Sequence, residues 1–145
     1  VPDIVLTSDI IVGFPGETTP EFEDTLSLIE EVRFDALFTF IFSPREGTPA
    51  ASMEDPMPME EKKANFQRLV DAQNAISAEK HAAYIGRRLR CLVDGVGEEM
   101  GYPLVARTPG NRLVRLENGE ECLVGSFRVV EIAGANTWSL TGRLV

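Results

Sequence analysis

The chain has 145 residues, 43% of them hydrophobic, and a formal net charge of −9. This length allows one domain or two small ones, and no apolar run approaches the roughly 20 residues of a membrane span. The acidic balance argues against a surface that binds nucleic acid throughout. Residues 1–81 carry 6 Lys and Arg against 16 Asp and Glu, whereas residues 82–145 carry 8 Arg against 7 acidic residues. This break predicts two domains, 1–81 and 82–145, with different partners.

The cysteines and the single histidine make no recognisable metal site. Cys91 and Cys122 lie far apart without Cys-x-x-Cys spacing, which favours reduced thiols in a cytoplasmic protein over a disulfide framework. His81 is expected near a helix end, as a C-terminal cation or surface residue. The start, Val-Pro-Asp, is typical of neither a signal nor a transit peptide, and the missing initiator Met suggests a fragment of a longer protein.

The stretch from Asp9 to Thr18 joins an apolar strand to a helix through a turn with two glycines. Gly13 and Gly16 allow positive φ or close approach to a ligand, and Pro15 stiffens the turn between them. Ligands bind at the carboxyl ends of parallel strands, so this turn is a candidate site. An ordinary strand-to-helix turn remains the alternative reading. The glycine spacing matches neither a phosphate loop nor a dinucleotide fingerprint.

The first third of the chain predicts a β-strand, an α-helix and a second β-strand. Residues 4–14 and 36–42 are apolar almost throughout, which favours strands covered on both faces. Between them, Thr19 is the expected N-cap, with Pro20 at the first helical position. Strand, helix and strand within about 40 residues form a βαβ unit with parallel strands. The apolar stripe of this helix consists of Phe22, Leu26, Ile29 and Val32.

A proline-rich loop over residues 43–58 follows the second strand and faces the same side as the glycine turn. Arg45 in this loop is suited to hold a carboxylate or phosphate, although a solvated loop arginine is the commoner case. A long helix is expected over residues 59–84. Its inward stripe consists of Phe66, Leu69, Val70, Ala72, Gln73 and Ile76.

After Gly86 the pattern changes to five short β-type runs separated by turn signals. Such spacing predicts a small closed barrel of the oligonucleotide-binding (OB) kind. The expected strands are Leu89–Val93, Leu104–Arg107, Leu113–Leu116, Leu123–Ile132 and Thr137–Val145.

Arginines recur along these strands and suggest an RNA-binding surface. The candidates for contacts with the phosphate backbone are Arg107, Arg112, Arg115 and Arg128. Trp138 is a possible stacking platform, but a lone Trp at strand spacing is more often a core residue. Because this half is nearly neutral, we expect moderate, salt-sensitive affinity for RNA.

Taken together, the motifs resemble the carboxyl-terminal part of the radical S-adenosylmethionine methylthiotransferases. The matching segments cover essentially the whole chain. The ending Thr-Trp-Ser-Leu-Thr-Gly resembles the tRNA-directed branch more than the branch that modifies a ribosomal protein. The segments are Ser-Asp-Ile-Ile-Val-Gly-Phe-Pro-Gly-Glu-Thr at 8–18, Phe-Asp at 34–35, Phe-Ile-Phe-Ser-Pro-Arg-Glu-Gly-Thr-Pro-Ala-Ala at 40–51, Gln-Asn-Ala-Ile-Ser at 73–77 and the ending at 137–142.

The resemblance implies an α/β fold: the last βα units of a partial (β/α) barrel in 1–81, then the five-stranded RNA-binding TRAM barrel in 82–145. It implies an enzyme that adds a 2-methylthio group to isopentenyladenosine beside the anticodon of tRNA. Its cofactors would be S-adenosylmethionine and two 4Fe-4S clusters. One cluster cleaves S-adenosylmethionine to a radical, and the other is tied to sulfur donation.

This sequence lacks both cysteine triplets that hold the clusters in that family. No cluster is therefore expected here, and the chain alone should be inactive. The resemblance leaves a cofactor-facing wall, formed by Val12, Gly13, Phe14, Pro15, Ser43 and Arg45. The apolar strands of 1–81 should also leave an uncovered face, so we expect this chain to self-associate.

Two other interpretations of the sequence remain open. One is a non-catalytic RNA-binding protein in which the acidic half only supports the barrel. The other is the sister enzyme, whose barrel would contact a ribosomal protein instead of the tRNA anticodon stem-loop.

Overall fold

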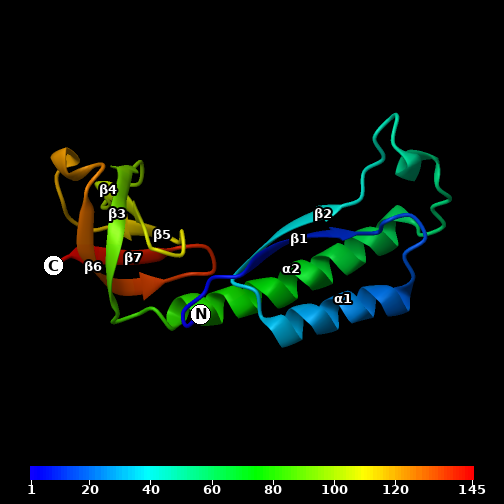
Figure 1. Cartoon of the computed structure of the whole chain (residues 1–145), viewed down its shortest axis with the longest axis horizontal. Coiled ribbons are helices and arrows are strands. Elements are labelled where there is room, and N and C mark those ends of the chain that lie inside the picture. Colours follow the sequence, from blue (N-terminus) through cyan, green and yellow to red (C-terminus); the bar gives the residue numbers. More distant parts are fainter. The chain divides into compact units, whose positions relative to one another are not determined.

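The computed structural model describes residues 1–145, which divide into two compact units. One unit contains residues 5–76, and the other contains residues 1–4 and 77–145. The long second helix contributes to both units, and each unit is described by itself below (Figure 1). Neither long helix combines the length and apolar character that crossing a bilayer requires.

The unit of residues 5–76 is built from two parallel strands and two helices. Strand β1 (Thr7–Val12) pairs with β2 (Ala36–Ile41) in parallel, with Thr7 opposite Ala36 and Val12 opposite Ile41. The helix α1 (Thr19–Val32) connects the two strands. After a 3₁₀ turn, η1 (Pro49–Ser52), the helix α2 (Met59–Ala82) begins. The βαβ unit predicted from the sequence is therefore present, whereas the larger partial (β/α) barrel remains an expectation.

The amino end of α1 is capped one residue earlier than the sequence suggested. Thr18, not Thr19, is the N-cap, and its hydroxyl accepts from the backbone N–H of Glu21. The Glu21 carboxylate in turn accepts from the backbone N–H of Thr18 at 2.8 Å, which completes a capping box. The backbone N–H and the hydroxyl of Thr18 both donate to this carboxylate, and they hold the pKa of Glu21 below its ordinary value.

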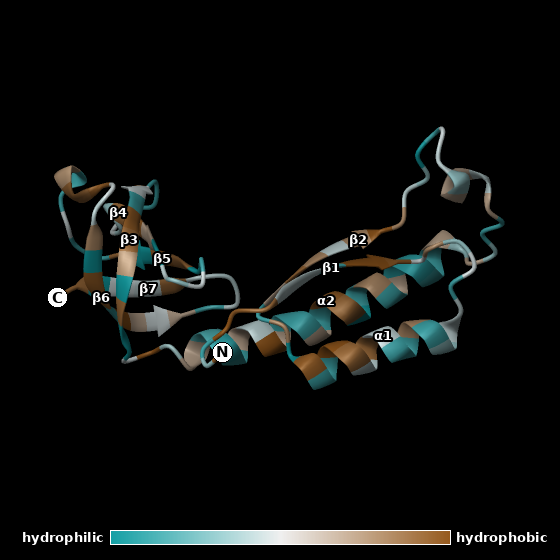
Figure 2. Cartoon of the chain, in the orientation of Figure 1, coloured by the Kyte–Doolittle hydropathy of each residue, from teal (hydrophilic) through white to brown (hydrophobic).

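Only one face of the two-stranded sheet is covered, in contrast to the predicted strands buried on both faces. The side facing α1 and α2 carries the core, in which Phe22, Ile29 and Leu69 have no exposed surface. On the other side Ile11, Phe38 and Phe40 are each more than half exposed. The alternation of exposed and less exposed residues along β1 and β2 shows this one-sided packing, although Figure 2 colours much of both strands brown.

Helices α1 and α2 are also joined at their surface. Arg68 of α2 donates to both carboxylate oxygens of Glu23, at 2.6 and 3.0 Å, and its guanidinium lies over the ring of Phe22. This paired hydrogen bond lowers the pKa of Glu23. Of the stripe predicted for α2, Leu69, Gln73 and Ile76 are buried.

The second unit contains a closed barrel of five strands, as predicted. The strand order around the barrel is β3-β4-β5-β7-β6, with β5 and β7 parallel and the other four pairs antiparallel. This closed, mixed barrel is consistent with an OB-like TRAM fold. The strands are β3 (Arg88–Val96), β4 (Leu104–Arg107), β5 (Leu113–Leu116), β6 (Phe127–Ala135) and β7 (Leu140–Leu144).

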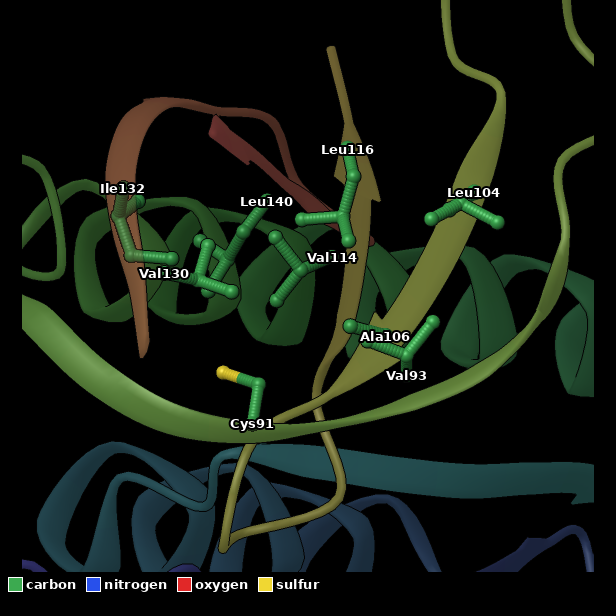
Figure 3. Packing of buried hydrophobic residues seen from close by; sticks show 9 residues of the cluster. All are labelled: Cys91, Val93, Leu104, Ala106, Val114, Leu116, Val130, Ile132 and Leu140. Carbon is green, nitrogen blue, oxygen red and sulfur yellow. The ribbon is translucent and has the colours of Figure 1, made fainter. Parts of the chain in front are cut away.

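The barrel interior is filled by alternate residues of its strands (Figure 3). Nine side chains, including the Cys91 thiol, have at most 1% exposure. The fourth strand begins later than predicted, because residues Glu121–Leu123 form the 3₁₀ turn η2 and Gly125 has a φ of 84°. The members of the core are Cys91, Val93, Leu104, Ala106, Val114, Leu116, Val130, Ile132 and Leu140.

Candidate functional site

The turn after β1 is held together by its own hydrogen bond and by a lysine. Gly13 has a φ of 72°, and its N–H donates to the Glu17 carboxylate at 2.9 Å. The stem of Lys62 runs across Gly13, so that a Cβ there would lie 2.6 Å from Cδ of the lysine. The Lys62 ammonium is paired with Asp55 of the proline-rich loop. The turn, this loop and the start of α2 are thus joined.

Four of the six residues predicted for the cofactor-facing wall belong to this packed turn. Val12, Gly13 and Pro15 are buried. Phe14 is 43% exposed, and its ring meets Phe42 edge-on, with the centroids 5.3 Å apart. None of the four lines the hollow described next.

The other two predicted residues, Ser43 and Arg45, lie together at the carboxyl end of β2. They line an open hollow of about 540 Å³, here called the strand-end hollow. Its wall includes Ile11 and Phe40, two of the exposed apolar residues of the sheet. The complete lining is Asp9, Ile11, Phe40, Ile41, Phe42, Ser43, Arg45, Thr48 and Ala50. The predicted set lacks Asp9, Thr48 and the apolar lining residues. Their position in the sequence, on or just after the same two strands, could have indicated them.

The side chains at the carboxyl end of β2 suit a small organic ligand with apolar and polar parts, but not an iron–sulfur cluster. The strand-end hollow combines apolar side chains, two hydroxyls, one guanidinium and one carboxylate. The chain has no group of three or more His, Cys, Asp or Glu side chains able to hold a metal. Cys91 lies in the barrel core, where burial raises the pKa of its thiol to about 11, and Cys122 is exposed. A cluster needs several thiolates at one place.

The four arginines predicted to contact RNA do not form one cluster. Arg107 is paired with Asp94, Nε to Oδ2 at 3.2 Å. Arg112 is buried, 7% exposed, with its guanidinium carbon 5.0 Å from the centroid of the Tyr84 ring. Arg128 is exposed and donates to the neighbouring carbonyl of Phe127. Arg112 is therefore a structural residue of the barrel in this chain, and Arg107 and Arg128 remain accessible.

Arg115 on β5 ties two loops of the barrel together. Its Nε pairs with Glu99 at 2.7 Å, in the loop between β3 and β4, and its Nη1 donates to the Ser139 hydroxyl, in the turn between β6 and β7. Loops at these two places, beside the second and third strands, hold the ligand in OB folds. Arg115 also lines a hollow with Val105 of β4.

The turn that carries Ser139 also presents Trp138 to solvent. Trp138 is 75% exposed, so the expected core position is wrong and the stacking alternative survives. The side chain of Asn136 fixes the turn, because its Oδ1 accepts from the backbone N–H groups of Trp138 and Ser139, both at 2.8 Å. The exposed ring therefore sits on an ordered turn.

His81 lies in the last turn of α2, as predicted, but it is not a surface residue. It is only 5% exposed, and its Nδ1–H donates to the Thr137 carbonyl at 2.9 Å. This contact connects the end of α2 to the turn before β7 within the second unit. His81 is thus a buried structural histidine.

Two functional candidates escaped the sequence interpretation. Arg90 of β3 lies over the ring of Phe127, with its guanidinium carbon 4.4 Å from the ring centroid. Both residues are exposed and line an open hollow with Arg107. The alternation of side chains along β3 could have indicated Arg90, because Arg90 and Leu92 flank the inward Cys91 and therefore face outward.

Comparison with known proteins supports both the TRAM barrel predicted for residues 82–145 and the resemblance of the whole chain to methylthiotransferases. Residues 82–145 match the TRAM domain. All 145 residues align with tRNA-2-methylthio-N(6)-dimethylallyladenosine synthases: 48% identical to that of Acetivibrio thermocellus, 50% to that of Bacillus cereus and 48% to that of Symbiobacterium thermophilum. The chain spans 30%, 28% and 31% of these relatives, respectively. The resemblance inferred from the motifs is confirmed, and the chain matches a part of these enzymes.

Proposed function

We propose that this chain, a TRAM-containing part of a tRNA methylthiotransferase, supplies the RNA-binding barrel and one wall of the cofactor pocket. The parent would add a 2-methylthio group to isopentenyladenosine next to the anticodon. The observation that carries this proposal is the identity of 48–50% over all 145 residues to enzymes of that name. The parallel β1-α1-β2-α2 unit would then be the end of a partial (β/α) barrel.

In the proposed barrel–RNA contact, accessible arginines neutralise phosphates and Trp138 stacks on an unpaired base. Arg115 and the turn bearing Trp138 lie at the loops where OB folds bind oligonucleotides. Arg107 and Arg128 add two further positive charges on the barrel. Glu98 and Glu99 line the same hollow as Arg115 and limit the attraction for phosphate, which predicts moderate affinity.

In the proposed cofactor wall, the strand-end hollow would face S-adenosylmethionine. Ile11 and Phe40 offer apolar surface to the adenine ring, the hydroxyls of Ser43 and Thr48 can hydrogen-bond polar groups, and Arg45 can hold the carboxylate. When bound, S-adenosylmethionine supplies the radical precursor and the methyl group. The Val12–Pro15 turn would support this wall from behind, because three of its residues are buried. The two 4Fe-4S clusters need ligands that this chain does not provide.

The test is RNA binding by the full 145-residue chain, followed by fluorescence anisotropy. The probe is a tRNA anticodon stem-loop carrying isopentenyladenosine, compared with an unrelated hairpin of equal length. We expect tighter binding to the stem-loop and affinity that falls with salt. Arg115→Ala should weaken binding and lower the salt slope by about one. Arg68→Ala, which removes the same charge from the unit of residues 5–76, is the matched control and should leave binding unchanged.

Equal affinity for both hairpins would contradict the anticodon assignment. Preference for a ribosomal protein over the stem-loop would favour the sister enzyme. Binding that does not respond to salt would exclude phosphate contacts as the basis of recognition.

A further inference from the structure

Three side chains form a row across the outer face of β4, β3 and β6. Leu92 of β3 lies opposite Arg107 of β4 on one side and opposite Phe127 of β6 on the other. Cross-strand neighbours on one face have Cβ atoms about 4.5–5.5 Å apart, so the row is continuous. The inward residue Cys91 precedes Leu92, which confirms that the row faces away from the core. The row forms part of an open hollow of about 450 Å³, here called the Phe127 hollow.

One wall of the Phe127 hollow is a stacked pair of a ring and a guanidinium. Phe127 is 52% exposed on a strand, and Arg90 lies over its ring at 4.4 Å. Unpaired bases of RNA stack on aromatic rings and on guanidinium planes. The pair therefore offers a flat surface that is both apolar and positively charged.

The opposite wall supplies polar groups held in place. The Nε of Arg107 pairs with Asp94 at 3.2 Å, and its Nη1 donates to the Asn111 carbonyl at 3.5 Å. These contacts orient the guanidinium while leaving Nη2 for an added acceptor. Asn111 has a φ of 61°, lines the same hollow and is exposed. An amide and a guanidinium together suit the polar edge of a base or an adjacent phosphate.

We propose that the Phe127 hollow binds one unstacked nucleotide of single-stranded RNA. The base packs against Arg90 and Phe127, and its edge or its phosphate meets Arg107. This second contact lies on the β4-β3-β6 face and adjoins the hollow lined by Arg115, because Arg107 pairs with Leu113 of that hollow. Two adjoining contacts would lead an RNA strand along the outer surface of the barrel. The inference rests on the proposed RNA-binding function.

A nucleotide fits this hollow better than a protein segment does. The flat base of a nucleotide matches the stacked Arg90–Phe127 pair, and its polar edge matches the Asn111 amide. The negative charge of its phosphate matches the two guanidinium groups. Asp94 neutralises only one of the two arginines that line the hollow. An acidic peptide would engage the arginines but would leave the flat Arg90–Phe127 surface without a matching partner.

The test uses the full chain and a single-stranded oligoribonucleotide with one central 2-aminopurine. Its control is the same oligonucleotide with an abasic residue at that position. We expect Phe127→Leu, which keeps apolar bulk, and Arg90→Lys, which keeps the charge, to weaken binding of the intact oligonucleotide about 5- to 100-fold. The matched control Arg143→Lys changes the same residue type outside the hollow and should bind like the unaltered chain. Circular dichroism verifies that each variant is folded.

The abasic comparison separates recognition from a structural effect. The unaltered chain should lose affinity when the base is removed, whereas Phe127→Leu should bind both oligonucleotides equally. Quenching of 2-aminopurine on binding should also disappear in that variant. If both variants retain full affinity and quenching, the hollow is not the site, even though RNA binding through the Arg115 face stands. If the unaltered chain binds no RNA, the proposed function fails and this inference fails with it. If the two variants lose binding to a ribosomal protein but keep their RNA binding, the inference is also overturned.

Discussion

Lys62 occupies the space that a side chain at Gly13 would need, since a Cβ at Gly13 would lie 2.6 Å from Cδ of the lysine. The same lysine pairs with Asp55 and lies 5.9 Å from the centre of the Phe42 ring. Gly13 is thus constrained twice, by its φ of 72° and by the stem of Lys62, whose ammonium is held in an ion pair. The turn after β1 is a packed element, not a free loop.

Gly13→Ala should lower the free energy of unfolding by about 2–4 kcal/mol, because backbone strain adds to overpacking. Gly16→Ala is the matched control. Gly16 has a φ of 86°, but no atom lies within 4 Å of the place that a Cβ would take there, so only the strain of about 1–2 kcal/mol applies. Urea denaturation followed by circular dichroism measures both. Equal losses for the two variants would contradict the role of Lys62.

Glu131 should make the barrel more stable at neutral pH than in acid. Hydrogen bonds from Arg143 and then Arg88 hold the pKa of Glu131 below its ordinary value. Since the folded pKa is the lower one, the stabilisation is present above the unfolded pKa of about 4.3 and is lost as pH falls through the folded value.

Glu131→Gln should therefore unfold at lower temperature than the unaltered chain at pH 7, with the gap closing towards pH 3. Thermal melts at a series of pH values measure this difference. Glu117→Gln, at an exposed glutamate of the same barrel, is the control. A gap that is constant across this range would exclude the ion pairs as its cause.

The two thiols should react at very different rates. Cys122 is exposed, whereas Cys91 has no exposed surface and burial raises the pKa of its thiol to about 11. At pH 8 a disulfide reagent should label one thiol per folded chain, and two after denaturation. Cys122→Ser should abolish the fast phase. Rapid labelling of that variant without denaturant would show that the barrel core is open to solvent.

The exposed face of the small sheet should drive self-association of this chain. Ile11, Phe38 and Phe40 are 52%, 60% and 54% exposed on β1 and β2, and each strand has one unpaired edge. Light scattering at increasing concentration should give a mass above that of one chain. Phe38→Lys should restore the single-chain mass, whereas Leu28→Lys on the exposed side of α1 should not. A single-chain mass for the unaltered protein would refute this expectation.

The sequence predicts the elements well where local signals are strong. The predicted bounds of β4 and β5 agree with the structure, because turn residues flank both short apolar runs. The predicted start of β6 is too early, since Leu123 is apolar yet lies in a 3₁₀ turn. The core position expected for Trp138 is wrong because strand spacing does not reveal that Asn136 caps an exposed turn.

The candidate sites are harder to predict, because they depend on which strands become neighbours. Arg112 is expected on an RNA-binding surface but packs on Tyr84, a residue 28 positions earlier in the chain. The Phe127 hollow requires the register that places Leu92 between Arg107 and Phe127. Nothing in the linear order of these residues specifies that register. Ser43 and Arg45 are identifiable because both follow directly from one strand end.

The parallel pairing of β5 with β7 has a consequence for how the barrel is made. The strand β7 hydrogen-bonds to both β5 and β6, and Gly142 packs so tightly there that a Cβ would lie 2.6 Å from the Glu131 carbonyl oxygen. Until residues 140–144 have left the ribosome, the other four strands can form only an open sheet, in which β5 and β6 each have one unpaired edge. A premature stop before Leu140 would thus leave the barrel open and its core accessible, and we expect such a product to be degraded by proteases.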